Sequence, residues 1–269
     1  MKDAAFGRSL RLAAFLSALA LPLHGANDLE AVKKRGTLRV LVVEGAPAFV
    51  ALRPGEAPGF EREILDGFAR LHEIKIELVE VAAWERLVPD LLAGRGDVIA
   101  GGVTDNAARR VHIDFTAEIF PTRDVVLTRR PTLPILTLEE LRKVRVGTIK
   151  GTSLADRVTE AKVPPANIDD TLPATGFADA LRSRRVAAVI DGVEDALLLK
   201  KVDPALELGM FLGPSQSLAF GVRKDAPALR AALSEYVGYI RKSAVWSRLS
   251  VKYFGSAAAE VLKNARSSQ

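Results

Sequence analysis

The sequence predicts an α/β protein with two αβ lobes, and three observations support that prediction. Hydrophobic runs of strand length alternate with segments of helical periodicity over the first hundred residues. The alternation is interrupted near Pro131 and Pro134, and a second alternating unit covers about 132–210. A further strand and a long amphipathic helix follow it. Because alternating helices and strands form sheets covered by helices, two such units predict two lobes.

The first 26 residues have the pattern of a secretory signal peptide. Basic residues precede an apolar run from Leu12 to Leu23, which is too short to span a bilayer comfortably. Cleavage is expected after Ala26, although His24 is not the small residue usual three positions before a cut. An uncleaved membrane anchor is the alternative. We therefore expect a mature protein that is soluble in the periplasm.

Composition argues against several classes of function. The formal net charge of +5 falls to about +3 without the signal segment, and the basic residues are scattered rather than gathered in the stripe that nucleic-acid binding needs. The chain has no cysteine, which excludes disulfides and thiolate chemistry. The two histidines beyond the signal segment, His72 and His112, lack the spacing of a metal site. We expect no metal, no cofactor and no nucleic-acid partner.

The first unit alternates in the order αβαβαβ. Pro58-Gly59 marks the start of a helix whose apolar positions, the last of them Leu71, fall on one face. The segment "KIELVEV" alternates as a strand should. We predict, in order, helix 28–35, strand 38–43, helix 60–71, strand 75–81, helix 84–93 and strand 97–102.

The second unit repeats the alternation after a strand that ends near Thr128. Thr137 and Glu140 have the spacing of a capping box, which places a helix start between them. A loop is expected at "FLGPSQ", residues 211–216, and the tail is expected to return to the first lobe. We predict, in order, strand 144–149, helix 154–162, helix 176–185, strand 186–191, helix 192–201, strand 217–225 and helix 226–249.

Seven segments resemble, in order, motifs of the family 3 extracellular solute-binding proteins, the amino-acid-binding type of periplasmic binding protein. They are "RGTLRVLV", "GFEREILDGFA", "WERLVPDLLAGRGDVIAGGVT", "RRVHIDFT", "VGTIKGTS", "LRSRRVAAVIDG" and "VKYFG". The resemblance covers about 28–255. It implies a periplasmic binding protein type II-like fold, in which two αβ lobes joined by two crossovers enclose a ligand cleft. The implied division is a signal peptide at 1–26, a discontinuous first lobe at 27–129 and 212–269, and a second lobe at 130–211.

The resemblance also assigns ligand-binding residues. Arg109 matches the arginine that grips a ligand's α-carboxylate, for which a planar guanidinium with two parallel donors is suited. Thr104 matches a hydroxyl beside it, and Ser153 matches the contact from the second lobe. Asp191 matches the acid that pairs with the α-ammonium, and Trp84 matches an aromatic wall. Alternative interpretations are a solvated Arg109, Ser153 as a helix N-cap, Asp191 in a turn and Trp84 in the core.

Several positions depart from the family pattern. Ala46, in "APAF", stands where an aromatic residue is common, and Ala108 replaces the glutamate usual before the arginine. An indole opposite alanine indicates a bulkier or flatter ligand than the usual one. Gly101 and Gly102 replace small polar residues, so side-chain contacts are lost there while backbone N–H groups remain. Gly102 is therefore included in the predicted site.

The resemblance implies a non-enzymatic monomer that captures an amino acid or related carboxylate by hinge closure. Its implied partner is the inner-membrane permease of an ABC-type importer. The alternative is an enzyme on the same fold, of the cyclohexadienyl (prephenate/arogenate) dehydratase type, with Glu194 or Asp191 as general acid. Membrane-bound murein lytic transglycosylases carry a similar domain followed by a catalytic one. Because 14 residues follow Gly255, that activity is not expected.

Overall fold

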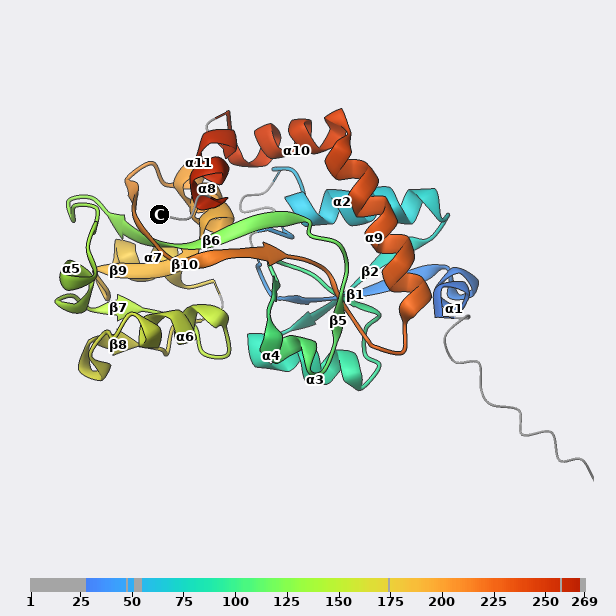
Figure 1. Ribbon diagram of the computed structural model, residues 1–269, viewed down its shortest axis with the longest axis horizontal. Coiled ribbons are helices and arrows are strands. Elements are labelled where there is room, and N and C mark those ends of the chain that lie inside the picture. The colour runs from blue at the N-terminus through green and yellow to red at the C-terminus, as the bar shows by residue number, and fades with distance from the viewer. Residues whose placement is uncertain (1–27, 47, 51–54, 174, 257, 267–269) are drawn as a thin grey trace, which may run out of the picture.

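The computed structural model describes residues 28–46, 48–50, 55–173, 175–256 and 258–266 (Figure 1). The predicted signal peptide lies outside the described residues. The helices are α1 Asp28–Arg35, α2 Phe60–Leu71, α3 Leu87–Leu92, α4 Ala107–Arg110, α5 Leu138–Arg142, α6 Ser153–Glu160, α7 Phe177–Arg182, α8 Val193–Val202, α9 Pro227–Lys242, α10 Ala244–Phe254 and α11 Ala258–Arg266, with short 3-10 turns at Trp84–Arg86 and Pro165–Asn167. The strands are β1 Thr37–Val43, β2 Lys75–Val81, β3 Val98–Ile99, β4 Thr104–Asp105, β5 Asp114–Phe115, β6 Phe120–Arg129, β7 Val146–Gly147, β8 Ile168–Asp169, β9 Ala188–Gly192, β10 Leu206–Leu218 and β11 Gly221–Val222.

The strands form two sheets that underlie two αβ lobes, as the sequence predicts. The first lobe is built on the five-stranded sheet in the order β2-β1-β3-β11-β5. The six-stranded sheet has the order β4-β10-β6-β9-β7-β8. Its strands β9, β7 and β8 belong to the second lobe, β6 and β10 cross between the lobes, and β4 joins the far end of β10 on the side of the first lobe. Strand β1 pairs in parallel with β2 and β3, and β9 pairs in parallel with β7. Burial on both faces explains the uninterrupted apolar residues Val40–Val43 in β1 and Ala188–Ile190 in β9.

Local sequence signals set several element boundaries. Gly59 precedes α2 with φ 126°, and a Cβ there would come within 2.5 Å of the Phe49 backbone. Only glycine meets both conditions, so the helix starts where the sequence predicts. At α5 the Thr137 hydroxyl accepts a hydrogen bond from Glu140 N, and the Glu140 side chain accepts one from Thr137 N, which completes the predicted capping box. Leu71, expected on the apolar face of α2, is instead 65% exposed because it lies at the fraying end of the helix.

Two long antiparallel strands, β6 and β10, run side by side across the molecule and connect its two halves (Figure 1). The predicted loop at 211–216 is wrong, because these residues lie within β10. The register of β10 on β6 shifts between Leu208 and Phe211 and again between Leu212 and Gln216. Such irregularities bend a strand and break its alternating pattern, which is why the sequence reads as a loop there. The predicted lobe boundaries at 129/130 and 211/212 both fall on this pair of strands.

After β11 the chain packs first on α1 and α2 of the first lobe and then reaches α8 of the second. The single helix expected over 226–249 is two helices, α9 and α10, because Ser243 leaves the helical backbone and caps α10 by accepting from Val245 N. Helix α9 contacts α1 and α2, and α10 contacts α2 and α8. Helix α11, which was not predicted, lies against β6 and α8 (Figure 1).

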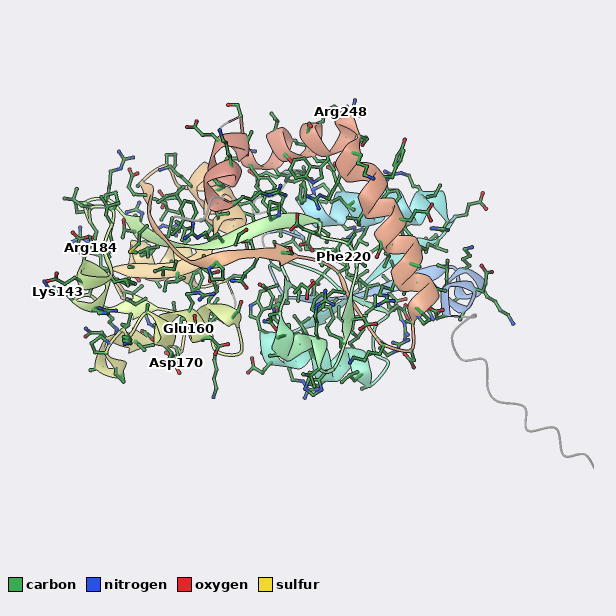
Figure 2. All side chains as sticks on the ribbon, viewed as in Figure 1. Lys143, Glu160, Asp170, Arg184, Phe220 and Arg248 are labelled. Atoms are coloured by element: carbon green, nitrogen blue, oxygen red, sulfur yellow. The ribbon has the colours of Figure 1, made fainter. Side chains whose placement is uncertain are left out.

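Aromatic side chains hold the tail against the body of the protein. The Phe60 ring on α2 lies 5.5 Å from Phe120 on β6 and 5.1 Å from Phe254 on α10, between ring centroids. These distances are typical of favourable aromatic pairs. Phe220, between β10 and β11, is fully buried near the middle of the molecule, whereas Lys143 and Arg184 stand at the outer end of the second lobe (Figure 2). Among the described helices, none is long and apolar enough to cross a membrane.

Candidate functional site

A cavity lies between the two lobes and brings together all six residues of the predicted site. It offers about 70 Å³ to the centres of water molecules. Because one water needs roughly 10–15 Å³ by the same measure, the cavity has room for a ligand of several heavy atoms. Its lining is Trp84, Gly102, Thr104, Arg109, Thr122, Asp124, Ile149, Thr152, Ser153, Leu154, Thr175, Phe177, Asp191, Gly192, Glu194, Asp195 and Leu199.

Arg109 is held in place by the short helix α4 and by its own guanidinium. The Asn106 side chain caps the helix by accepting from Arg109 N at 2.9 Å. Arg109 Nη1 donates to Thr104 O at 2.8 Å, which directs the guanidinium toward the cavity. Desolvation lowers the pKa of Arg109 from its ordinary value, while Asp156 acts to raise it. None of the described carboxylates forms an ion pair with Arg109, so its remaining donors are available to an anion.

The neighbouring Arg110 is different. Its side chain is exposed, hydrogen-bonds Asp105 through two nitrogens, and lies 5.7 Å from the Phe115 ring centroid. The sequence assigns Arg110 to the surface, and the structure places it there. The two adjacent arginines therefore form a natural pair for experiment, since one lines the cavity and the other does not.

Thr104 and Ser153 meet across the lobe boundary. The two hydroxyl oxygens are 3.4 Å apart, so the first and second lobes are in contact beside Arg109. Ser153 is not the N-cap of α6, because that position belongs to Thr152, whose hydroxyl donates to Ile149 O at 2.6 Å instead of accepting from the helix. The backbone N–H groups at the start of α6 therefore lack a side-chain cap, and they lie next to the cavity.

Asp191 is the residue before the end of β9 and is 5% exposed. Its Oδ1 accepts from Gly192 N at 2.9 Å. Burial raises the pKa of Asp191 well above its ordinary value, and the nearby carboxyls of Asp195 and Glu194 raise it further. The residue therefore lies near a strand end and is also an acid that faces the cavity.

Trp84 opens the 3-10 turn before α3 and is partly buried. It packs against two of the hydrophobic clusters, so part of its surface serves the core. The rest lines the cavity, and its indole Nε1 is buried without a hydrogen-bond partner in the described structure. Trp84 therefore packs in the core and also lines the cavity, which are the two alternatives that the sequence left open.

The backbone N–H groups of the two glycines bind a carboxylate of the protein itself. Gly101 N donates to Glu61 Oε2 at 2.6 Å, and Gly102 N donates to Glu61 Oε1 at 3.0 Å. A buried carboxylate from α2 therefore occupies the donors that sequence reasoning left without a partner. Burial raises the pKa of Glu61 to about 7, although both hydrogen bonds oppose the rise. Gly102 still lines the cavity, with φ 85°, but its contact with a ligand stays a prediction.

Sequence reasoning missed Glu61 and Asp195 and named Glu194 only as an alternative catalytic acid. Glu194 is 4% exposed, accepts a short hydrogen bond from the Thr122 hydroxyl, and has a pKa raised by burial to about 8. Asp195 is partly buried, and burial raises its pKa to about 7. A signal for Glu61 existed, since it shares a helical face with the core positions 64, 65 and 68. No group of three acidic or histidine side chains in the described part of the chain could hold a metal ion.

Two αβ lobes with a cavity between them are the architecture of the periplasmic binding protein type II fold. The chain belongs to the bacterial extracellular solute-binding proteins, family 3, whose sequence profile matches residues 38–256. It is similar in structure to a solute receptor for L-cysteine of Neisseria gonorrhoeae, with a TM-score of 0.76, 22% identity and coverage of 89% of this chain and 98% of that one. It is also similar to a mutant of ArgBP from T. maritima, with a TM-score of 0.75, 23% identity and coverage of 85% and 100%. At these identities the structural likeness shows the fold.

Two curated relatives are membrane-bound lytic murein transglycosylases F. The protein from Desulfosudis oleivorans is 22% identical over 228 residues, which are 83% of this chain and 50% of that protein. The protein from Photobacterium profundum is 25% identical over 238 residues, which are 85% of this chain and 46% of that protein. The chain thus spans about half the length of the curated relatives it matches.

Proposed function

We propose that this protein captures an α-amino acid between its lobes. Arg109 binds the carboxylate, with Thr104 and Ser153 as hydroxyl partners, and Asp191 binds the ammonium. Trp84 forms one wall, and Gly102 gives the backbone room to approach. The observation that supports the proposal best is the position of Arg109, a largely desolvated guanidinium that faces a cavity and has no carboxylate paired with it. An arginine in that state gains most from a ligand carboxylate.

Closure of the lobes would couple binding to delivery. Thr104 and Ser153 come from different lobes and are in contact, so a ligand that touches both favours the closed arrangement over an open one. We propose that the closed protein, a monomer in the periplasm after signal cleavage, delivers its ligand to the permease of an ABC-type importer. The domain division at 27–129, 130–211 and 212–269 belongs to this proposal. Amino-acid-binding neighbours, among them the substrate-binding protein of an amino acid ABC transporter, support it.

A thermal-shift screen of amino acids, followed by calorimetry, tests the proposal. A ligand at one hundred times its Kd adds about 2.7 kcal/mol of stability, which a melting curve detects easily. Arg109→Ala is expected to abolish binding, whereas Arg110→Ala, its exposed neighbour, is expected to leave Kd within about two-fold. Unchanged affinity in Arg109→Ala, or no binding of any α-amino acid to the wild type, would refute the carboxylate clamp.

The role of Asp191 has its own test. Asp191→Asn keeps the size of the side chain and an oxygen for Gly192 N but removes the charge. It is expected to weaken an α-amino acid at least ten-fold while sparing the matching carboxylic acid that lacks the ammonium. An equal loss for both ligands would make Asp191 a structural residue only.

One observation favours a second candidate, an enzyme of the dehydratase type on the same fold. Glu194 has a pKa near 8 and is therefore mostly in its acid form at neutral pH, which is the state a general acid needs. It also lines the cavity. Incubation of the purified protein with prephenate or arogenate tests this candidate. Product that forms with the wild type and not with Glu194→Gln would favour the enzyme over the binding protein.

A further inference from the structure

We infer that Glu194 and Asp195 form a subsite for a second cationic group, so that the ligand is an amino acid with an ammonium or guanidinium on its side chain. The inference rests on the proposed amino-acid clamp and adds the substrate class to it. Its basis is a contrast in how the protein treats buried carboxyls inside and outside the cavity.

Outside the cavity, three of the four buried carboxyls in the described part of the chain are matched with arginines, and the fourth, Glu61, accepts from the N–H groups of Gly101 and Gly102. Asp90 pairs with Arg86 and Arg95 at 2.7 Å each. Asp97 pairs with Arg35 and, at 2.8 Å, with Arg39, and Asp169 pairs with Arg145 at 3.1 Å and Arg185 at 2.8 Å. Asp124, at the margin of the cavity, pairs with Arg157 at 2.7 Å. This is the usual condition for a charge that folding removes from water.

Inside the cavity, three of the four described lining carboxyls have no such partner, and the exception is Asp124 with its Arg157. None of the described cationic side chains forms an ion pair with Asp191, Glu194 or Asp195, and Arg109 is the single cation among the described lining residues. Asp195 Oδ1 is wholly buried and lacks any hydrogen-bond partner in the described part of the chain. In the proposed clamp, the α-carboxylate matches Arg109 and the α-ammonium matches Asp191. Glu194 and Asp195 then remain without a positive partner.

The two carboxyls are placed to act together on a ligand that touches both lobes. They are consecutive residues at the start of α8, in the second lobe. Asp195 Oδ2 approaches the first lobe, because it would lie 3.6 Å from a Cβ added to Gly102. Apolar side chains of the same cavity, Trp84, Phe177 and Leu199, offer a wall for the methylene groups that separate the two charged ends of such an amino acid. Burying those methylenes against apolar side chains is favourable.

Surrounding charges make a cation favourable at this subsite. The charged groups that face Glu194 and Asp195 are Asp191 on β9, Asp124 on β6 with its partner Arg157, Glu61 on α2, and Arg109 on α4. Burial and the neighbouring acids raise the pKa of Glu194 to about 8 and that of Asp195 to about 7, so protons neutralise them when no cation is present. A bound ammonium or guanidinium lowers both pKa values and displaces the protons. Affinity for a cationic amino acid is therefore expected to rise between pH 6 and pH 8.

Isosteric ligand pairs isolate the second cation. L-Arginine and L-citrulline differ in a guanidinium against a neutral urea group, and L-lysine and L-norleucine differ in an ammonium against a methyl group. Calorimetry at pH 7.5 is expected to give at least ten-fold tighter binding for the cationic member of each pair. Proton release, measured in buffers of different ionisation enthalpy, is expected to be larger for lysine than for norleucine and larger for arginine than for citrulline, because only the cationic side chain displaces protons from Glu194 and Asp195.

Variants then locate the subsite. The double variant Glu194→Gln, Asp195→Asn is expected to lose the preference for lysine over norleucine while norleucine binds within about three-fold of the wild type. The control Asp179→Asn, which alters an exposed acid on α7, is expected to change neither ligand. Melting curves confirm that each variant is folded.

The outcomes separate this inference from the proposed function. Equal or tighter binding of citrulline and norleucine would overturn the cationic subsite and leave the amino-acid clamp standing. A preference for arginine and lysine that survives in the double variant would also overturn it, because other residues would then carry the selectivity. Failure of every amino acid to bind would instead remove the proposed function on which the inference rests.

Discussion

Two sets of buried carboxyls in this protein differ in their partners. Asp90, Asp97 and Asp169, in the outer parts of the lobes, each touch two arginines. Asp191 and Glu194, in the cavity, are 5% and 4% exposed and touch no described cation. The pKa of Asp169 is held well below its usual range, mainly by its hydrogen bond with Arg185, whereas burial raises the pKa of Glu194 to about 8.

The two sets of carboxyls have opposite effects on the stability of the folded chain. An acid with arginine partners is ionised at neutral pH and stabilises the folded chain against its unfolded form. An acid buried without a cation destabilises the fold once it ionises, because it is taken out of water with no compensation. Asp191, Glu194 and Asp195 line the cavity, where a ligand of the proposed kind would supply the missing positive charge.

The largest effect is expected from removing an acid of the outer set. Asp97→Ala leaves Arg35 and Arg39 without their shared partner and removes the acceptor of Arg39 N. Losing one side of a buried pair costs about 3–5 kcal/mol, and the partial exposure of both arginines places the expected loss at about 2–4 kcal/mol. Urea unfolding measures it. A loss below about 1 kcal/mol would show that the outer acids are as dispensable as surface ones.

A pH scan of the ligand-free wild type should show the opposite behaviour of the cavity set. Glu194 has a pKa of about 4.5 when unfolded and about 8 when folded, so its stabilising contribution is complete below pH 4.5 and is lost as pH rises toward 8. The lowered pKa values of Asp169 and Asp203 act only in acid. The expected loss between pH 5.5 and 8.5 is on the order of 1–3 kcal/mol, and a Tm that rises over this range contradicts the comparison.

A smaller effect, opposite in sign to that of Asp97→Ala, is expected for Glu194→Gln. The amide keeps an acceptor for the Thr122 hydroxyl and cannot ionise. The ligand-free variant should be more stable than the wild type at pH 8.5 by on the order of 1–2 kcal/mol and nearly equal to it at pH 5.5. Paired melting curves at both pH values provide the measurement. Destabilisation at pH 8.5 would place Glu194 with the outer set.

The smallest effect is expected where both members of an ion pair are exposed. The Glu139 and Lys143 side chains on and beside α5 are 78% and 68% exposed, and their ion pair spans 2.6 Å. Glu139→Gln should change the free energy of unfolding by less than about 0.5 kcal/mol at moderate salt. Urea unfolding again measures it. A larger change would mean that burial is not what separates the two sets of acids.

Sequence reasoning reached much of the fold and only part of the site. The resemblance to the family motifs indicated Arg109 and Thr104, and the capping box indicated the start of α5. It missed β10, because two register shifts disturb its alternation. It also left the N–H groups of Gly101 and Gly102 without a partner, whereas Glu61 accepts from both. Glu61 lies 40 residues before Gly101 along the chain, so a motif of neighbouring residues could not reveal their contact.

The sequence by itself determined the local elements and the chemical types in the cleft, because helical periodicity, caps and turn residues act over a few neighbours. Tertiary structure alone decided which carboxyls are buried and which of those find an arginine. Asp195 reaches Gly102 only when the two lobes are packed together. Whether a carboxyl is paired with an arginine or buried without a cation depends on its surroundings in space. Desolvation and Coulomb energy are set by distance and burial and not by position along the chain.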